Sequence, residues 1–203
     1  MSIDPTVAIG AELGKRSFSW AFSDILLYHL GIGAGANPLD PRELRYVYEK
    51  DLQVLPTFAT AIPDFRDTEP PRISYPGIKV DLRKAVLGIQ SLEVHQPIPI
   101  AGRAVASERI ADVFDKGTGA LILKETAVTD DRGRPFWTSV MSIFARGEGG
   151  FGGRRGPSNR TVTPARPPDA VVDTRTLLQQ AFLYRLCGDR NPMHVDPDLA
   201  RAE

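Results

Sequence analysis

Residues 102–146 read GRAVASERIADVFDKGTGALILKETAVTDDRGRPFWTSVMSIFAR. Three runs in this stretch are rich in strand-forming residues: Gly102–Phe114, Ala120–Thr129 and Phe136–Arg146. Two short segments rich in Asp and Gly separate them, Asp115–Gly119 and Asp130–Arg134, and this is the chemistry of tight turns. The stretch therefore predicts three consecutive antiparallel strands.

The residues before this meander predict one main helix. Ser23 and Asp24 can cap a helix over Ile25–Leu30, and Gly31 can end it. One early helix followed by a long antiparallel meander indicates an α+β fold. Four weaker predictions complete this region: one helical turn at Pro41–Leu44, a strand at Arg45–Glu49, a surface loop at Pro63–Pro76 and an extended segment at Ile89–His95.

Composition changes after Arg146. Residues 147–168 contain six glycines and four prolines and almost no apolar residues, which is typical of a linker. Beyond it we expect a short strand at Val171–Thr174 and an amphipathic helix at Thr176–Leu186. The second of these resembles the helix near Leu27–Leu30, so the segment after the linker is interpreted as the start of a second domain like the first.

Charge and cysteine content exclude several classes of protein. Lys plus Arg equals Asp plus Glu at 25 each, so nothing indicates binding to nucleic acid or to an anionic membrane. Cys187 is the only cysteine, which rules out an intrachain disulfide. The longest apolar stretch, Ile25–Ala36, is much shorter than the ~20 residues of a membrane span, and no secretory signal is recognisable. We expect a soluble, cytoplasmic protein.

The densest group of reactive side chains lies near the C-terminus. Asp189 and His194 are five residues apart, and Pro192 between them prevents a continuous helix. A compact loop can turn both side chains toward one point, and a carboxylate with a histidine suits proton transfer near neutral pH. Asn191 could orient either partner. The same residues also make a good solvated turn without any catalysis.

Other chemistries fit these residues less well. The loop lacks the ligand pattern of a calcium loop, and a zinc site at His194 and Asp196 would lack partners, so we expect no metal. His29 lies on an apolar helix face and is interpreted as a core residue. Cys187 is expected to pack at a helix end. A glycosylation sequon at 159–161 has no role in an intracellular protein.

Residues 184–197, YRLCGDRNPMHVDP, closely match the motif of the hydratase 2 (MaoC-like) branch of the hot-dog superfamily. The resemblance extends upstream through several shorter matches, so it covers most of the chain: Asp24–Tyr28, Gly31–Gly35, Val54–Phe58, Asp115–Gly117 and Arg146–Gly153.

The resemblance implies a double hot-dog fold, in which each antiparallel sheet wraps around a central helix. This chain would carry one complete N-terminal hot-dog (1–146), the linker (147–170) and the start of a second hot-dog (171–203), and so would be C-terminally truncated relative to the family. The family's sheet and central helix beyond this point include a backbone amide that polarises the thioester carbonyl. The chain also has Val86–Gln90 where family members commonly have Leu-His-Gly-Glu-Gln.

The function implied is (R)-specific hydration of trans-2-enoyl-CoA, or the reverse dehydration, in fatty-acid or sterol side-chain metabolism. Asp189 and His194 would be catalytic and would need no cofactor, since the CoA thioester is itself the substrate. The supporting residues would be Asn191 and Gly188, and substrate contacts would come from Tyr184, Arg185 and Arg190. Two alternatives stay open: a thioesterase, and a non-catalytic hot-dog subunit or acyl-CoA-binding module that completes a partner's site. A homodimer or a heteromer with another hot-dog subunit is expected.

Overall fold

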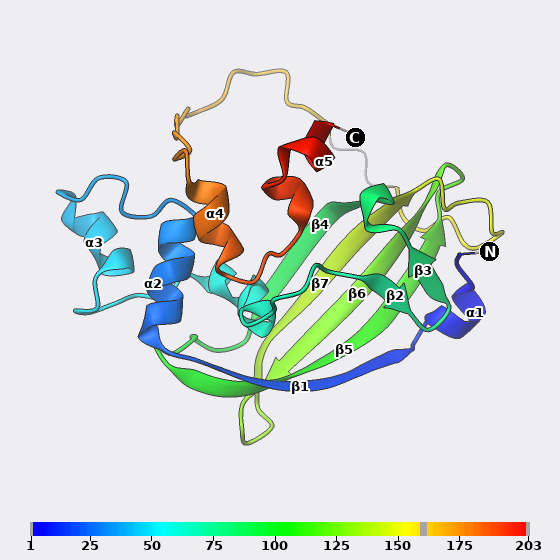
Figure 1. The fold of residues 1–203 in the computed structure, drawn as a ribbon, viewed down its shortest axis with the longest axis horizontal. Helices are drawn as coiled ribbons and strands as arrows, with labels where there is room; N and C mark the ends of the chain where they lie inside the picture. The colour runs from blue at the N-terminus through cyan, green and yellow to red at the C-terminus, as the bar shows by residue number, and fades with distance from the viewer. Residues whose placement is uncertain (1, 159–161, 202–203) are drawn as a thin grey trace.

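Five antiparallel strands form one curved sheet in the order β1-β5-β6-β7-β4 (Figure 1). The structure is a computed structural model that describes residues 2–158 and 162–201, so the sequon at 159–161 lies outside the described residues. The strands are β1 (Glu12–Trp20), β2 (Ile73–Tyr75), β3 (Ile78–Val80), β4 (Ala85–Val94), β5 (Gly102–Asp115), β6 (Gly119–Thr129) and β7 (Pro135–Arg146). The α-helices are α1 (Pro5–Ala8), α2 (Phe22–Gly31), α3 (Pro41–Val47), α4 (Gln180–Arg185) and α5 (Pro197–Arg201).

The three-strand meander is confirmed as β5, β6 and β7, within one or two residues of the expected bounds. Lys124 of β6 pairs with Ile110 of β5 on one side and with Met141 of β7 on the other. The extended segment at Ile89–His95 is the larger part of β4, which pairs with β7. The α+β fold class is therefore confirmed.

Helix α2 packs against the concave face of one end of the sheet (Figure 1). Its Ile25 and Tyr28 are buried with Phe58 and with Trp137 of β7. Asp24 lies one turn into the helix and accepts a hydrogen bond from the backbone N–H of Ala21 at 3.0 Å, which caps the first turn. The helix thus begins at Phe22, three residues earlier than expected.

A second core lies at the other end of the same concave face. The hairpin β2–β3 covers it, burying Ile73 and Ile78 against Ile122 and Ile143 of the sheet. The hairpin lies near the predicted Pro63–Pro76 loop, which is therefore a loop only up to Ile73. The sheet face consequently carries two separate apolar clusters, one under α2 and one under the hairpin.

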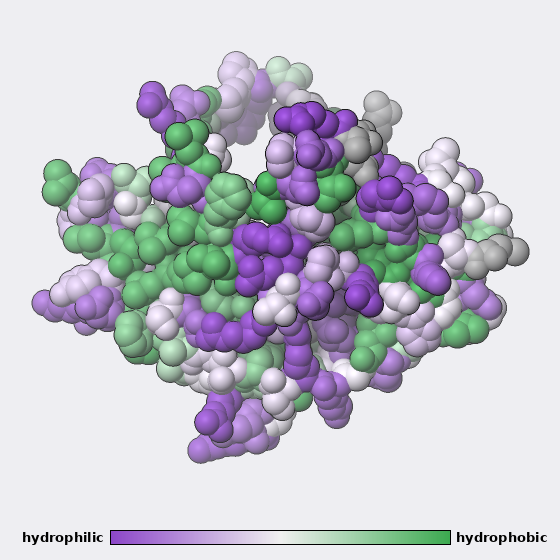
Figure 2. Space-filling model, viewed as in Figure 1, coloured by the Kyte–Doolittle hydropathy of each residue, from purple (hydrophilic) through white to green (hydrophobic). Residues whose placement is uncertain are grey.

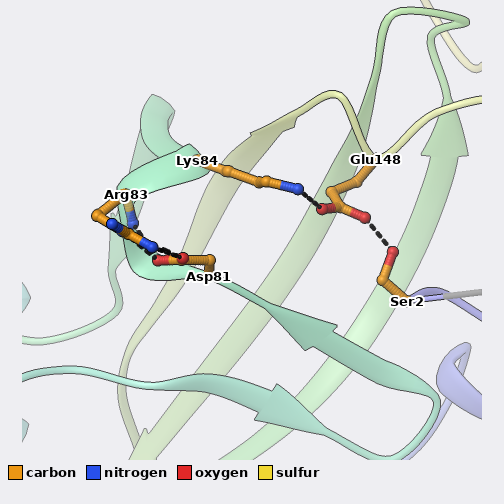
Figure 3. Close-up of polar contacts among 5 residues, drawn as sticks. All are labelled: Ser2, Asp81, Arg83, Lys84 and Glu148. Atoms are coloured by element: carbon orange, nitrogen blue, oxygen red, sulfur yellow. Dashed lines mark hydrogen bonds and ion pairs between the residues drawn. The ribbon is translucent and has the colours of Figure 1, made fainter. Parts of the chain in front are cut away.

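Polar contacts join the N-terminal residues to two other segments at this end of the sheet (Figure 3). The carboxylate of Glu148 accepts a hydrogen bond from the hydroxyl of Ser2. It also forms an ion pair with Lys84, whose Nζ lies 2.7 Å from Glu148 Oε1. Close by, Arg83 pairs with Asp81 at 2.6 Å. The first residues of the chain are thereby joined to the segment before β4 and to the segment after β7.

The strand predicted at Arg45–Glu49 is wrong, because α3 occupies most of it. The Asp40 side chain accepts from the backbone N–H of Arg42 at 2.8 Å, and Pro41 fills the first helical position. This cap and proline start a helix that overrides the strand preference of the residues that follow.

Two predictions after the linker also need correction. Residues 171–174 form no strand, and no described strand lies beside them to provide hydrogen-bond partners. The helix expected over Thr176–Leu186 is shorter, because α4 covers Gln180–Arg185 only. Helix α4 lies beside α2, as Figure 1 shows. Within residues 2–158 and 162–201, no helix is long and apolar enough to cross a membrane.

Candidate active site

The loop after α4, residues 186–194, is folded by its own short polar side chains. Asp189 Oδ1 accepts a hydrogen bond from the backbone N–H of Asn191 at 3.2 Å. Asn191 Oδ1 accepts in turn from the backbone N–H of Met193 at 3.1 Å, which caps the 3-10 turn Pro192–His194. These two turns reverse the chain between Asp189 and His194. We call residues 186–194 the motif loop.

The motif loop brings the carboxylate of Asp189 close to the ring of His194. Asp189 Oδ2 lies 3.9 Å from His194 Nε2. This is longer than a hydrogen bond, but both atoms can bind one water molecule placed between them. The two side chains are 34% and 59% exposed respectively, so this water has access to a substrate.

Residues 64–67 support the motif loop from below. Gly188 lies against the carbonyl oxygen of Asp64, and Arg190 Nε donates to the carbonyl oxygen of Asp67 at 2.8 Å. From β1, the guanidinium of Arg16 pairs with the carboxylates of Asp64 and Asp67. Burial lowers the pKa of Arg16, but the two carboxylates more than offset this and raise it. The loop is therefore fixed to the sheet through one ion-paired turn.

Helix α4 holds the other end of the motif loop. Tyr184 packs against Tyr28 of α2, with ring centroids 6.2 Å apart, and its backbone lies against Gly31. Burial raises the pKa of Tyr184 to about 12. The thiol of Cys187 is buried at the end of α4, and burial raises its pKa to about 12 as well. Cys187 thus packs at a helix end, as expected, and carries no thiolate at neutral pH.

A cavity of about 730 Å³ lies between the motif loop and the concave face of the sheet. Tyr184, Gly188, Asp189, Arg190, Asn191 and His194 form its wall on the motif-loop side. Arg185, the remaining candidate for a substrate contact, instead donates to the carbonyl oxygen of Asn191 at 3.3 Å and so buttresses the loop. The candidate catalytic pair therefore faces a partly open cavity of ligand size.

Metal ligands do not gather here. Among the described residues, no three His, Cys, Asp or Glu side chains are placed to hold one metal ion. His29 is fully buried, with Nδ1 2.6 Å from the carbonyl oxygen of Tyr46, and it is the core residue that the sequence predicts.

Sequence reasoning missed the charged residues on the sheet side of the cavity. Lys124 and Glu108 lie on β6 and β5 and form an ion pair there, and Arg16 of β1 lies at the edge of the same cavity. A signal for Lys124 exists in the sequence. In β6 the inward positions are Ala120, Ile122, Lys124, Thr126 and Val128, so a lysine and a threonine interrupt the apolar alternation.

Comparison with known proteins places this chain in a family. Residues 18–147 match the model of the MFE-2 hydratase 2 N-terminal domain. An enoyl-CoA hydratase of Mycobacterium tuberculosis, ChsH3, is 50% identical over 202 residues, which cover this whole chain and 71% of that protein. The mouse peroxisomal multifunctional enzyme type 2 is 36% identical over 95% of this chain, which spans 26% of the mouse protein.

The solved structure of a MaoC-like dehydratase from Phytophthora capsici has the same fold. It superposes with a TM-score of 0.76 at 27% identity and covers 95% of this chain, which spans 66% of that protein. The sheet around α2 is accordingly the hot-dog fold that the motif implied. The family model matches well over half of the chain, from within β1 to one residue past the end of β7. The chain therefore belongs to the hydratase 2, MaoC-like family of hot-dog proteins.

Proposed function

We propose that the chain hydrates trans-2-enoyl-CoA to (3R)-hydroxyacyl-CoA, or catalyses the reverse dehydration, as a hydro-lyase of fatty-acid or sterol side-chain metabolism. The observation that carries this proposal is the pair of Asp189 and His194, whose reactive atoms lie 3.9 Å apart on the wall of a 730 Å³ cavity. The name of one relative, an enoyl-CoA hydratase, and the match of this chain to the MFE-2 hydratase 2 N-terminal domain support it.

The geometry supports a simple proton balance. A water molecule held by Asp189 and His194 places its oxygen at the β-carbon of the enoyl group. As the new C–O bond forms, the pair takes one proton from the water, and the electrons of the double bond move toward the thioester carbonyl. The pair then returns one proton to the α-carbon on the same face. The protein ends in its starting protonation state, and no redox or metal cofactor is required.

The cavity suits the acyl part of such a substrate. Its volume lies within the range of small-molecule sites, and Leu13, Leu82, Met141 and Ile143 contribute apolar lining on the sheet side. Asn191 and Gly188 shape the loop that holds the catalytic pair, and Tyr184 and Arg190 stand beside it. We place the boundaries of the hot-dog, linker and second segment at 1–146, 147–170 and 171–203, and the protein in the cytoplasm, where a single thiol stays reduced.

Hydration tests the proposal directly. The chain is given a trans-2-enoyl-CoA, and the loss of the conjugated enone absorbance is followed while the configuration of the product alcohol is determined. The proposal requires the (R)-alcohol and loss of activity in Asp189→Asn. Release of free CoA thiol at the same rate as substrate loss would instead establish a thioesterase. An (S)-alcohol, or full activity of Asp189→Asn, would contradict the assignment of the site.

A second function is favoured by the exposed apolar side chains after the linker. Val172 is 84% exposed, Leu178 is 101% exposed and Phe182 is 58% exposed. Such side chains indicate a surface that another hot-dog subunit covers, in a homodimer or a heteromer. In that case the chain contributes Asp189 and His194 to a shared site.

Sedimentation of the chain alone and with a hot-dog partner distinguishes the two functions. Activity that appears only on mixing, with formation of a complex, supports the subunit role. Activity of a stable monomer supports the first proposal.

A further inference from the structure

A partly buried ion pair lies on the sheet side of the cavity, opposite the motif loop. Lys124 Nζ of β6 lies 2.7 Å from Glu108 Oε1 of β5, and the hydroxyl of Thr126 donates to the same oxygen at 3.3 Å. The side chains of Lys124 and Glu108 are only 15% and 27% exposed. Both residues line the cavity that Asp189 and His194 face. We call Lys124, Glu108 and Thr126 the polar belt.

The polar belt separates the two apolar clusters of the concave face. Along β6, Ile122 belongs to the cluster under the β2–β3 hairpin and Val128 to the cluster under α2, while Lys124 and Thr126 lie between them. On the molecular surface in Figure 2, hydrophilic residues likewise lie between hydrophobic surfaces on the left and on the right. A ligand that extends along the sheet from the motif loop therefore meets polar side chains between the two apolar clusters.

Stability alone does not explain this pair. A buried ion pair contributes little net free energy compared with apolar side chains of similar volume, because removing two charges from water offsets their attraction. Burial lowers the pKa of Lys124, but the nearby carboxylate of Glu108 more than offsets this and raises it, so Lys124 stays charged. An ammonium has three donors and a carboxylate about four acceptor positions, so the belt keeps hydrogen-bonding capacity directed at the cavity.

We propose that the polar belt binds a neutral oxygen, a hydroxyl or carbonyl group, on the part of the acyl chain remote from the thioester. A neutral group fits because basic and acidic side chains line the cavity in equal number, so no excess charge remains for a carboxylate or an amine. A hydroxyl can accept from Lys124 and donate to Glu108 while these two side chains stay paired with each other, whereas an alkyl chain can form neither bond. This inference rests on the proposed acyl-CoA function and adds a preference for oxygenated acyl groups.

Binding of saturated acyl-CoA tests the belt without any reaction. The probes are ω-hydroxyacyl-CoA thioesters from decanoyl to hexadecanoyl length and their unsubstituted counterparts, and the dissociation constants are measured by titration calorimetry. The variant Glu108→Leu with Lys124→Met replaces the pair by apolar side chains of similar size. The preference is the dissociation constant of the unsubstituted probe divided by that of the hydroxylated probe. We expect this ratio to be about tenfold larger for the wild type than for the variant at one or more chain lengths.

The matched control lies on the opposite face of the same two strands. Arg109 and Glu125 form a cross-strand pair at 2.8 Å, next in register to the belt but outside the cavity. Arg109→Met with Glu125→Leu should leave the preference for the hydroxylated probe unchanged. Thr126→Val is a second, smaller change in the belt, and it should shift the preference in the same direction as the double variant.

The outcomes separate this inference from the proposed function. Equal preference in the wild type and the belt variants at every chain length would overturn the polar belt, whatever the hydration assay shows. A selective loss in the belt variants together with an absence of hydration would uphold the belt and contradict the hydratase. Failure of the chain to bind any of these thioesters would overturn both.

Discussion

Gly188 lies so close to Asp64 that a Cβ added to Gly188 would be 2.1 Å from the carbonyl oxygen of Asp64. Gly188 also has a φ of +101°, which side-chain-bearing residues rarely adopt. The motif loop therefore crosses the 64–67 turn at Gly188, where only a residue without a side chain fits. This contact sets the height at which Asp189 stands above the sheet.

Replacing Gly188 by alanine should displace the motif loop. We expect Gly188→Ala to lose hydration activity and to lower the free energy of unfolding by about 1–3 kcal/mol, because it adds both backbone strain and a collision. Gly133 provides the control: its φ is +77° in the β6–β7 turn, with open space where a Cβ would be. Gly133→Ala should carry the strain alone and keep activity. Equal activity of both variants in a steady-state assay would contradict the supporting role of the 64–67 turn.

Asp115 ties the residues after β7 to the end of β5. Its carboxylate accepts from the backbone N–H groups of Gly150 at 2.9 Å, Gly117 at 2.8 Å and Gly152 at 2.8 Å. These bonds hold the pKa of Asp115 below its usual value, and the bond from Gly150 has the largest effect. The carboxylate thus stabilises the fold above the unfolded pKa of about 3.9, and this stability is lost as the pH falls through the lower folded pKa.

Asp115→Ala should therefore lower the melting temperature at neutral pH, and the difference from the wild type should shrink as the pH approaches about 3. The measurement is a series of thermal unfolding curves across that pH range. Asp131→Ala, at an exposed position in the next turn, is the control and should leave the melting temperature near that of the wild type. A difference between Asp115→Ala and the wild type that stays constant down to pH 3 would count against the role of this carboxylate.

His29 joins α2 to the segment after α3. Its Nδ1 lies 2.6 Å from the carbonyl oxygen of Tyr46, and its Nε2 accepts from the backbone N–H of Leu55 at 3.2 Å. Both bonds are made by the neutral ring with its proton on Nδ1. Burial lowers the pKa of His29, so the unfolded chain takes up a proton first and stability falls as the pH drops below about 6.5.

We expect His29→Phe to lower the free energy of unfolding by about 1–3 kcal/mol, since two buried backbone groups lose their partner. The loss of stability between about pH 7 and pH 5 should also become smaller in this variant. Denaturant unfolding at the two pH values measures both effects. An unchanged pH dependence in His29→Phe would contradict the claim that the buried His29 ring causes the loss of stability at low pH.

The sequence predicted the meander well because β5, β6 and β7 are long and follow one another, with clear turn residues between them. It did not predict β1 at Glu12–Trp20. This strand has a bulge near Gly14 and forms only by pairing with β5, some ninety residues later in the chain. The strand predicted at Arg45–Glu49 failed for the opposite reason, because a local signal, the cap at Asp40, outweighed residue preferences.

The site divides in the same way. The motif loop is local, so the sequence of residues 184–197 was sufficient to point to Asp189 and His194. The polar belt depends on the register between β5 and β6, which brings Glu108 beside Lys124 and aims both at the cavity. The alternation along β6 gives a sequence signal for Lys124, but no local pattern pairs Lys124 with Glu108. The cavity that both side chains line forms only when the motif loop packs over the concave face of the sheet.

The central claim is that Asp189 and His194 act as one catalytic unit on a shared water. Values of kcat/KM for hydration by Asp189→Asn, His194→Gln and the double variant test it most directly. Each single variant should lose about 100- to 10,000-fold, and the double variant should lose little more than the worse single variant, since either change disables the same step. Losses that multiply in the double variant would show two independent contributions and would contradict the claim.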